Sequence, residues 1–269
     1  MQALLPSVAE RNGIRAKALY SAGYMTFLQG NDQTARALLE ESASISRELG
    51  DKLGLAHASF MLGAAMAFGG DQEGQAINSE GISLFRQLGE EGKPGLVLGL
   101  MTSGMLTFLQ GDYSAARATF EECRALAREV GDSYGLAQAS NYLGDIARIE
   151  CNYLGAGSFY EESLPLFRDQ GSTSDIPAIL HNLGYVALAK QDYSEAEALF
   201  KESLALQQDM GNKQGISECL TGFAAIAGAQ GDPARAARLF GASEGLRTAI
   251  GVYMWPAERI EWERHVEAA

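Results

Sequence analysis

The side chains best suited to metal binding or thiol chemistry are few in this chain and far apart. None of the three histidines lies in an H-E-x-x-H or comparable metal-binding spacing: His57, His181 and His265. The three cysteines form no CxxC pair and have no histidine near them in the sequence: Cys123, Cys151 and Cys219. We therefore expect no metal site and no catalytic cysteine, and we interpret the cysteines as small core residues in a reducing cytoplasm.

The remaining patterns with chemical potential also predict no active site. The segment GEEGK at residues 89–93 has too few residues between its glycines for a phosphate-binding loop, and no Ser or Thr follows Lys93. G-x-S-x-G occurs at residues 131–135 and 241–245, but neither run follows a predicted strand, as the elbow of a hydrolase requires. Adjacent glutamates such as Glu121 and Glu122 recur at one position of a repeat, which is typical of a solvated helix face. The sequence thus predicts no catalytic residues and no cofactor, and a protein that is not an enzyme.

Composition narrows the classes of partner. The 269 residues are 46% hydrophobic, and 21 basic against 34 acidic side chains leave a net charge of −13. Such a field repels phosphate backbones and anionic lipid, so direct nucleic-acid binding is not expected. The longest nearly apolar stretch, residues 95–109, is shorter than the roughly 20 residues that span a bilayer. Because the N-terminal residues show no export signal either, we expect a cytoplasmic protein without a membrane span.

The elements that would position any site come from an internal repeat of about 40 residues. One turn signal is a Gly-Asp-like pair, which recurs at Gly30-Asn31, Gly70-Asp71, Gly111-Asp112, Cys151-Asn152, Gln191-Asp192 and Gly231-Asp232. The other is a single glycine, at Gly50, Gly89, Gly131, Gly171, Gly211 and Gly251. The segments between successive turns are long enough for one helix each, so the pattern predicts helical hairpins.

Each segment between turns also has the period of an amphipathic helix. In residues 192–210, Ala196, Leu199, Phe200 and Leu204 recur at helical spacing and define one apolar face. Glycine just past the end is the expected left-handed stop, and Asp or Asn before the next helix accepts its free N–H groups. The helix boundaries are therefore predicted by the local sequence.

The repeat resembles the tetratricopeptide family over nearly the whole chain. The family's first-helix glycine falls at Gly23, Gly63, Gly104, Gly144 and Gly184, with Ala224 in the sixth repeat. The small second-helix residue falls at Ala35, Gly74, Ala116, Ala156, Ala196 and Ala236, and the large one at Leu39, Asn78, Phe120, Tyr160, Phe200 and Phe240. Three residues later come Ser42, Gly81, Cys123, Ser163, Ser203 and Ser243. Because Asn78 replaces an aromatic residue, we expect the second helix of the second repeat to be the least well packed.

This resemblance implies an all-α, right-handed superhelical solenoid of six antiparallel hairpins with a C-terminal capping helix. The predicted repeats cover residues 1–254, at about 13–52, 53–93, 94–133, 134–174, 175–213 and 214–254. Residues 255–269 are predicted to form the capping helix, folded against the last hairpin near Phe240 and Leu246. The period exceeds the family's usual 34 residues, so both helices are expected to be longer than standard ones.

The long period and the last repeat are similar to the helical sensor arms of bacterial signal-transduction ATPases with LuxR-type DNA-binding domains. The segment that carries this similarity best is residues 231–263, GDPARAARLFGASEGLRTAIGVYMWPAERIEWE. The resemblance implies a sensor or interaction part of a bacterial signalling or transcriptional regulator.

In this family the first helices of the hairpins line a concave groove, and its binding positions can be transferred by register. The N-terminal repeats then contribute an apolar set: Tyr20, Tyr24, Phe27, His57, Phe60, Leu98, Met101, Met105 and Phe108. The next repeats contribute a polar set: Asn141, Asp145, Arg148, His181 and Tyr185. The sixth repeat adds Glu218, Thr221 and Ala225.

A groove that changes from apolar to polar suits a protein or peptide partner such as an amphipathic helix. Our first hypothesis from sequence is therefore a non-enzymatic, protein-binding scaffold. The alternative is a ligand-responsive receptor that holds a small molecule or signal peptide in the same groove. The carboxylate clamp of co-chaperones in this family is not expected, because the second and third repeats place His57, Phe60, Leu98 and Met101 at its positions.

Overall fold

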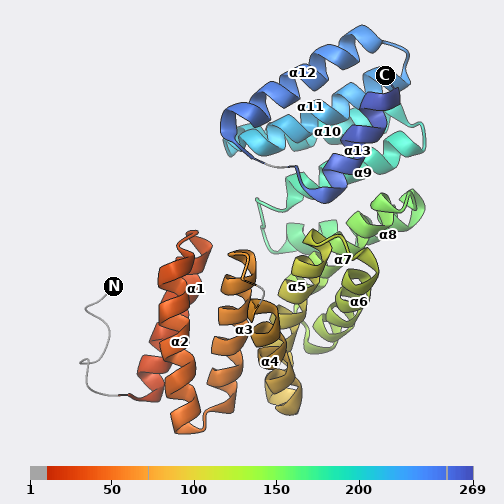
Figure 1. Cartoon of the computed structure of the whole chain (residues 1–269). Coiled ribbons are helices and arrows are strands. Elements are labelled where there is room, and N and C mark those ends of the chain that lie inside the picture. The colour runs from red at the N-terminus through yellow and green to blue at the C-terminus, as the bar shows by residue number, and fades with distance from the viewer. Residues whose placement is uncertain (1–10, 72, 253, 269) are drawn as a thin grey trace. The chain divides into compact units, whose positions relative to one another are not determined.

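The structure is a computed structural model that describes residues 11–71, 73–252 and 254–268 (Figure 1). The described residues form thirteen α-helices and one short 3-10 helix, and no strand occurs among them. The predicted all-α fold of tetratricopeptide-like hairpins is therefore confirmed. None of the helices in these ranges is long and apolar enough to cross a membrane.

The helices belong to two compact units, residues 1–135 and 136–269, which we call the N-terminal unit and the C-terminal unit. The N-terminal unit contains α1 (Gly13–Leu28), α2 (Asp32–Leu49), α3 (Lys52–Phe68), α4 (Glu73–Gln87), η2 (Gly89–Gly92), α5 (Lys93–Leu109) and α6 (Tyr113–Val130). The C-terminal unit contains all but the first residues of α7 (Ser133–Ile149), then α8 (Tyr153–Asp169), α9 (Ile176–Ala189), α10 (Tyr193–Asp209), α11 (Lys213–Ala229), α12 (Pro233–Ile250) and α13 (Pro256–Ala268). The odd-numbered helices α1 to α11 are the first helices of the hairpins, and the even-numbered ones are the second helices.

The helix boundaries follow the predicted local signals. Asp112 accepts a hydrogen bond from the backbone N–H of Ala115 at 3.0 Å, and Asp192 accepts one from Glu195 at 3.1 Å. Such side chains satisfy N–H groups that the first helical turn leaves free. At the other end, Gly131 adopts a left-handed conformation with φ of 74° and stops α6.

The tight turn inside each hairpin also needs a left-handed residue. Glycine fills this position at Gly30, Gly70, Gly111 and Gly231. Cys151 and Gln191 occupy it in the fourth and fifth hairpins, with φ of 60° and 61°. Residues with a Cβ rarely adopt this conformation, so these two turns carry backbone strain that the glycine turns avoid.

Within a hairpin, the large residue of the second helix packs on the glycine of the first helix. A Cβ on Gly184 would overlap the ring of Phe200, and a Cβ on Gly144 would overlap the ring of Tyr160. The Phe200 ring also packs on Gly222, which belongs to the first helix of the next hairpin. Both rings are fully buried. The glycines thus leave the space that the aromatic side chains fill.

A repeated hydrogen bond joins the two helices of most hairpins. The hydroxyl of Ser42 donates to the carbonyl of Ala16 at 2.8 Å, and Ser163 donates to Ala137 at 2.9 Å. Ser203 and Ser243 make the same bond to carbonyls 26 residues earlier. In each case, a small polar side chain satisfies its hydroxyl group inside the core.

The second hairpin does not show the loose packing that Asn78 led us to expect, so that prediction is wrong. Asn78 is 2% exposed, and its amide donates to the carbonyl of Phe60 at 3.0 Å. A Cβ on Gly63 would overlap the backbone of Asn78, and a Cβ on Gly81 would overlap Phe60. Because these glycines bring α3 and α4 into backbone contact, no aromatic side chain is needed between them.

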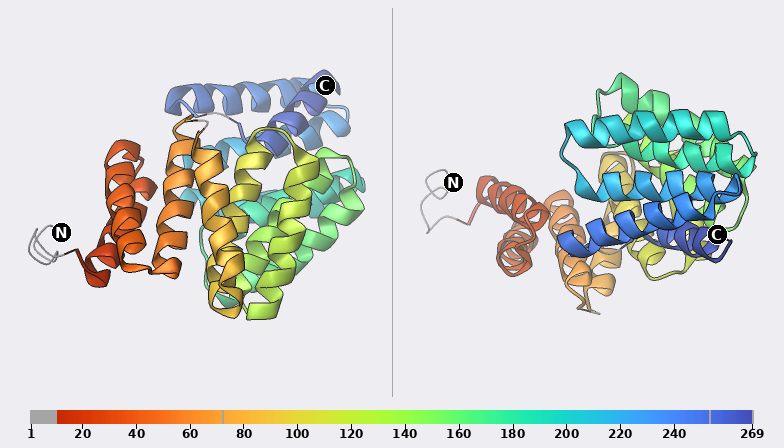
Figure 2. Two further views of the ribbon diagram at one scale, coloured as in Figure 1. Left: turned by 60° about the horizontal axis from the view of Figure 1, so that its bottom comes forward. Right: turned by 90° about the horizontal axis from the view of Figure 1, so that it is seen from above.

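The last helix, α13, lies against α11 and α12 of its own unit (Figure 2). The ring of Trp262 lies 6.4 Å from the ring of Phe240, as predicted for a helix that covers the last hairpin. The guanidinium of Arg247 lies 5.8 Å from the Trp262 ring. The opposite side of α13 faces α7, α8 and α9, and these contacts belong to the site described next.

Candidate functional site

In the N-terminal unit, the predicted aromatic residues form a row along the first helices. The rings of Tyr20 and Tyr24 are stacked 6.5 Å apart on α1, and Tyr20 lies 5.4 Å from His57 of α3. Phe27 contacts the exposed ring of Phe68 at 5.8 Å. The other members of the row are half-buried, so part of each ring remains accessible. Burial lowers the pKa of His57, which keeps this row uncharged at neutral pH.

The first helix of the third hairpin, α5, extends this surface. Two residues predicted for the surface, Phe60 and Phe108, do not belong to it. Leu98 is exposed on α5, and Met101 and Met105 are half-buried. Phe60 and Phe108 are both 0% exposed. They turn toward other core rings, since Phe60 lies 6.2 Å from Phe85 and Phe108 lies 5.4 Å from Tyr113. We therefore correct their assignment from groove to core.

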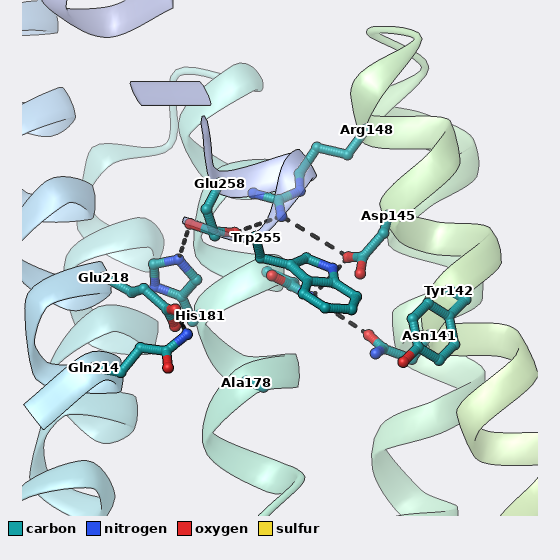
Figure 3. Close-up of a pocket in the computed structure, with 11 residues that line it drawn as sticks. Asn141, Tyr142, Asp145, Arg148, Ala178, His181, Gln214, Glu218, Trp255 and Glu258 are labelled. Carbon is teal, nitrogen blue, oxygen red and sulfur yellow. Dashed lines mark hydrogen bonds and ion pairs between the residues drawn. The ribbon is translucent and has the colours of Figure 1, made fainter. Parts of the chain in front are cut away.

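In the C-terminal unit, the predicted polar residues converge on one pocket of about 200 Å³ (Figure 3). The pocket is lined from α7 by Asn141, Tyr142, Asp145 and Arg148, from α9 by Ala178, His181 and Asn182, and from α11 by Gln214 and Glu218. Trp255 and Glu258, at the start of α13, complete the lining. Tyr185 is buried beside the pocket, with its ring 5.1 Å from His181 and 5.0 Å from the Arg148 guanidinium.

Glu258 is the centre of an ion-pair cluster that the sequence did not predict. Its carboxylate lies 2.6 Å from Nη2 of Arg148 and 2.9 Å from Nε2 of His181. All three side chains are buried. One carboxylate of α13 therefore forms ion pairs with two cations that come from α7 and α9.

The electrostatics of the cluster keep these groups charged in spite of burial. Burial opposes the charged form of His181 and is the largest single effect, but Glu258 and the neighbouring Cys219 together outweigh it and raise the pKa of His181 to about 10. Burial would likewise raise the pKa of Glu258, yet Arg148 and His181 hold it well below its ordinary range. The imidazolium and the carboxylate thus stabilise each other across the neutral pH range.

Asp145 lies on the other side of the pocket in a network of hydrogen bonds. Tyr160 donates to its carboxylate at 2.7 Å, Asn182 donates at 3.1 Å, and Trp255 supplies a further hydrogen bond. Arg148 is 3.8 Å away. Burial nevertheless raises the pKa of Asp145 to about 6. The network holds α7, α8, α9 and the Trp255 segment together.

Asp145 and Glu258 each form an ion pair with Arg148, whereas the hydrogen-bond partner of Glu218 is a neutral amide. Gln214, one helical turn earlier on α11, donates to Glu218 at 3.1 Å. Burial and then the charge of Glu258 raise the pKa of Glu218 to about 7. This side chain is therefore partly protonated near neutral pH.

The structure also brings one cysteine to a histidine, contrary to the expectation from sequence spacing. Cys219 of α11 lies close enough to His181 to contribute to the rise of its pKa. The thiol is 1% exposed, donates to Ser203 at 3.3 Å, and does not line the pocket. This geometry offers no path for a substrate to the sulfur. Among the described residues, no group of three or more His, Cys, Asp and Glu is placed to hold a metal ion.

Sequence reasoning missed two sets of functional residues. One set lies beside the predicted groove positions on α7, α9 and α11: Tyr142, Ala178, Asn182 and Gln214. The other set comes from α13 and the segment before it. Glu261 accepts a hydrogen bond from Tyr153 of α8 at 3.1 Å, and Arg264 donates to the carbonyl of Ile149 at 2.8 Å. Glu258 and Trp255 belong to the same set. In the sequence these residues resemble the solvated charges of a terminal helix, so no local pattern marks them as groove residues.

Comparison with known proteins agrees with this architecture. The tetratricopeptide repeat model matches residues 97–169 and 175–249, and a model of anaphase-promoting complex subunit 5 matches residues 12–67. No curated protein matches the chain.

Among solved structures, the apo form of RapI is 15% identical with a TM-score of 0.70, and the match covers 94% of this chain and 97% of RapI. BtubC from P. vanneervenii is 16% identical with a TM-score of 0.65, over 89% of this chain and 94% of BtubC.

The third structure is PH0952 from Pyrococcus horikoshii, a signal transduction ATPase with a tetratricopeptide repeat sensor. It is 16% identical with a TM-score of 0.69, and the match covers all of this chain but only 40% of PH0952. These identities establish similarity of fold. Since the tetratricopeptide model covers more than half of the 269 residues, the chain belongs to the tetratricopeptide repeat family.

Proposed function

We propose that this chain is the protein- or peptide-binding sensor module of a bacterial signalling or transcriptional regulator. The partner surface is the face of α1, α3 and α5 in the N-terminal unit. The observation that carries the proposal is the accessible apolar row on these first helices, which includes Tyr20, Tyr24, Phe27, Leu98 and Met101.

The composition of this face fits an amphipathic helix. Aromatic rings and methionines supply a large apolar contact area, and methionine adapts to partners of different shape. Leu98 and Phe68 are exposed beside half-buried rings, so a partner helix would remove further apolar surface from water.

The C-terminal unit offers an internal precedent for a helix on such a face. There, α13 contacts α7 and α9 through Glu258, and its Trp262 packs on the last hairpin. The first-helix face of one unit already accommodates a helical segment, which supports the same mode of binding on the other unit.

The fold comparisons support the regulatory part of the proposal. PH0952 is described as a signal transduction ATPase whose tetratricopeptide repeats are its sensor, and this chain matches 40% of that protein's length. We infer a corresponding role as the sensing or interaction part of a cytoplasmic regulator.

Site-specific photocrosslinking in cells tests the proposed surface. A photoreactive phenylalanine analogue at Met101 should capture a discrete partner, whereas the same analogue at Ser83, an exposed residue of the second helix α4, should not. The substitution Tyr24→Asp should abolish the crosslink from Met101. A partner captured equally at both positions, or unaffected by Tyr24→Asp, would place the interaction elsewhere.

A second candidate function is a ligand-responsive receptor. It is favoured by one observation, the small polar pocket of the C-terminal unit, to which α13 contributes Trp255 and Glu258. A ligand in this pocket would contact α13 directly and change the stability of its attachment.

A further inference from the structure

The pocket of the C-terminal unit has an unbalanced set of charges. Its lining includes three carboxylates, Asp145, Glu218 and Glu258, and two cationic side chains, Arg148 and His181. Asp145, Arg148, His181 and Glu258 are each more than nine-tenths buried. When all five groups are charged, the site has one negative charge in excess. Such a charge is costly to bury without a partner.

The excess charge can be assigned to a residue. Glu258 is held by both cations at 2.6 and 2.9 Å, and Asp145 accepts three hydrogen bonds near Arg148. Glu218 instead has the neutral amide of Gln214 as its hydrogen-bond partner, and the attraction of His181 and Arg148 does not offset the effects of burial and of the Glu258 charge there. The position that lacks a positive charge is therefore next to Glu218.

The walls around this position suit an organic cation with an apolar stem. The rings of Tyr142 and Trp255 lie 6.2 Å apart at an angle of 46°, and Ala178 adds an apolar wall between α7 and α11 (Figure 3). Aromatic faces attract cations and also pack against methylene groups. The amide of Asn141 adds a polar group near the aromatic pair.

The volume limits the size of the ligand. About 200 Å³ is smaller than the roughly 300 to 1,000 Å³ of pockets for drug-sized molecules. A single long side chain or a small amine fits this space. An anionic ligand would add to the negative excess of the pocket, since Nη2 of Arg148 and Nε2 of His181 are already paired with Glu258.

We propose that this pocket binds an alkylammonium group, with the cation at Glu218 and its stem against Tyr142 and Trp255. Two kinds of ligand present an alkylammonium group: a peptide with a lysine side chain, and a free small amine. The inference rests on the second candidate function, since it names the ligand class of that receptor pocket.

The titration of Glu218 is consistent with a missing cation. Its pKa is raised to about 7 by burial and by the charge of Glu258. An ammonium group beside it favours the carboxylate form, so binding at pH 7 should release about half a proton from Glu218. A neutral ligand of the same shape should release none.

Isothermal titration calorimetry of the full chain with three probes tests the proposal. The probes are Nα-acetyl-lysine N-methylamide, n-pentylamine, and Nα-acetyl-norleucine N-methylamide as the neutral match of the first. We expect at least one amine to bind, with a heat that differs between MOPS and phosphate buffer because a proton is released. If both amines bind, the small amine is a sufficient ligand; if only the lysine probe binds, the source is a peptide.

Substitutions in the pocket test where the ammonium group binds. Glu218→Gln should weaken amine binding by roughly tenfold or more, whereas Glu161→Gln, which removes an exposed carboxylate of α8 in the same unit, should leave it unchanged. Ala178→Trp should block the pocket sterically and abolish amine binding while Glu218 is still present. It therefore tests the site independently if Glu218→Gln fails to fold.

Two results would overturn the inference. They differ in whether they also reject the receptor function. Norleucine binding as tight as lysine binding would leave a receptor pocket without cation selectivity. The absence of binding by all three probes would reject both the inference and the receptor function, while the protein-binding surface of the N-terminal unit would still stand on its own test.

Discussion

The carboxylate of Glu258 lies 2.6 Å from the guanidinium of Arg148, which precedes it by 110 positions in the sequence. This buried ion pair, extended by His181 at 2.9 Å, attaches α13 to α7 and α9. The polar half of the predicted groove is therefore partly occupied by a helix of the same chain. Any ligand or partner on this face must bind beside α13 or displace it.

The first prediction concerns this attachment. Glu258→Gln should lower the free energy of unfolding of the C-terminal unit by about 3 to 5 kcal/mol, because it leaves two buried cations without a carboxylate. Hydrogen exchange should accelerate throughout α13, which mass spectrometry can measure. Glu263→Gln is the matched control, since Glu263 is exposed on the same helix and lies 3.9 Å from Arg259. Unchanged exchange in α13 after Glu258→Gln would contradict the role of the ion pair.

The second prediction concerns pH. The pKa of Glu218 is raised from 4.5 to about 7, so the folded state binds this proton more tightly than the unfolded state does. Stability from this group is present below pH 4.5 and is lost as pH rises through 7. Glu218→Gln should therefore stabilise the protein at pH 8, by at most about 3 kcal/mol, and have little effect near pH 4.5.

Denaturant unfolding of both proteins across this pH range measures the difference directly. Because the wild-type and Glu218→Gln curves share all other titrating groups, their difference isolates Glu218. A difference that stays constant with pH would show that the carboxyl of Glu218 titrates normally.

The third prediction separates core from surface. Phe200→Ala should cost about 3 to 5 kcal/mol, because the buried ring fills the space above Gly184 and Gly222. Phe108→Asp should unfold the N-terminal unit, since Phe108 is buried. In contrast, Tyr24→Asp with Met101→Asp should change the unfolding free energy by only about 1 kcal/mol and abolish partner binding.

Circular dichroism and thermal unfolding distinguish these outcomes. Loss of helicity in the Tyr24→Asp, Met101→Asp protein would assign both residues to the core. Normal folding together with normal partner binding would remove the N-terminal face from the proposed function.

The fourth prediction concerns the two strained turns. Cys151→Gly and Gln191→Gly should each stabilise the protein by up to about 1 kcal/mol, because both residues have positive φ where the other hairpins use glycine. Lys190→Gly is the matched control in the same turn. Lys190 has φ of −78°, so glycine there should destabilise by roughly 0.5 to 1 kcal/mol. Equal effects at Lys190 and Gln191 would argue against backbone strain as the cause.

The sequence by itself determined the helices and their turns, because the interactions that define them are local. An Asp or Asn accepts from an N–H group three residues later, and a left-handed glycine ends the helix it follows. The small and large positions of the repeat were also visible, since they recur every 40 or so residues, whereas the packing of the large residue on the first-helix glycine was seen only in the structure. The all-α hairpin fold followed from these short-range patterns.

Only the tertiary structure decided which positions of the predicted groove are accessible. Each residue of a helix is rotated by about 100° from the one before it, so residues of one helix meet different surroundings. A register taken from a family pattern therefore does not show that Met105 is half-buried whereas Phe108 is buried. The sequence also could not show that Gly63 and Gly81 bring α3 and α4 into contact around Asn78.

The tertiary structure likewise decided the chemistry of the C-terminal pocket. Arg148, His181 and Glu258 lie on three helices far apart in the sequence, and no local pattern relates the last helix to α7. The charge state of Glu218 depends on burial and on the field of Glu258, which exist only after the chain has folded. Local interactions are encoded within one helical turn, whereas the balance of charges in the pocket depends on where α13 finally packs.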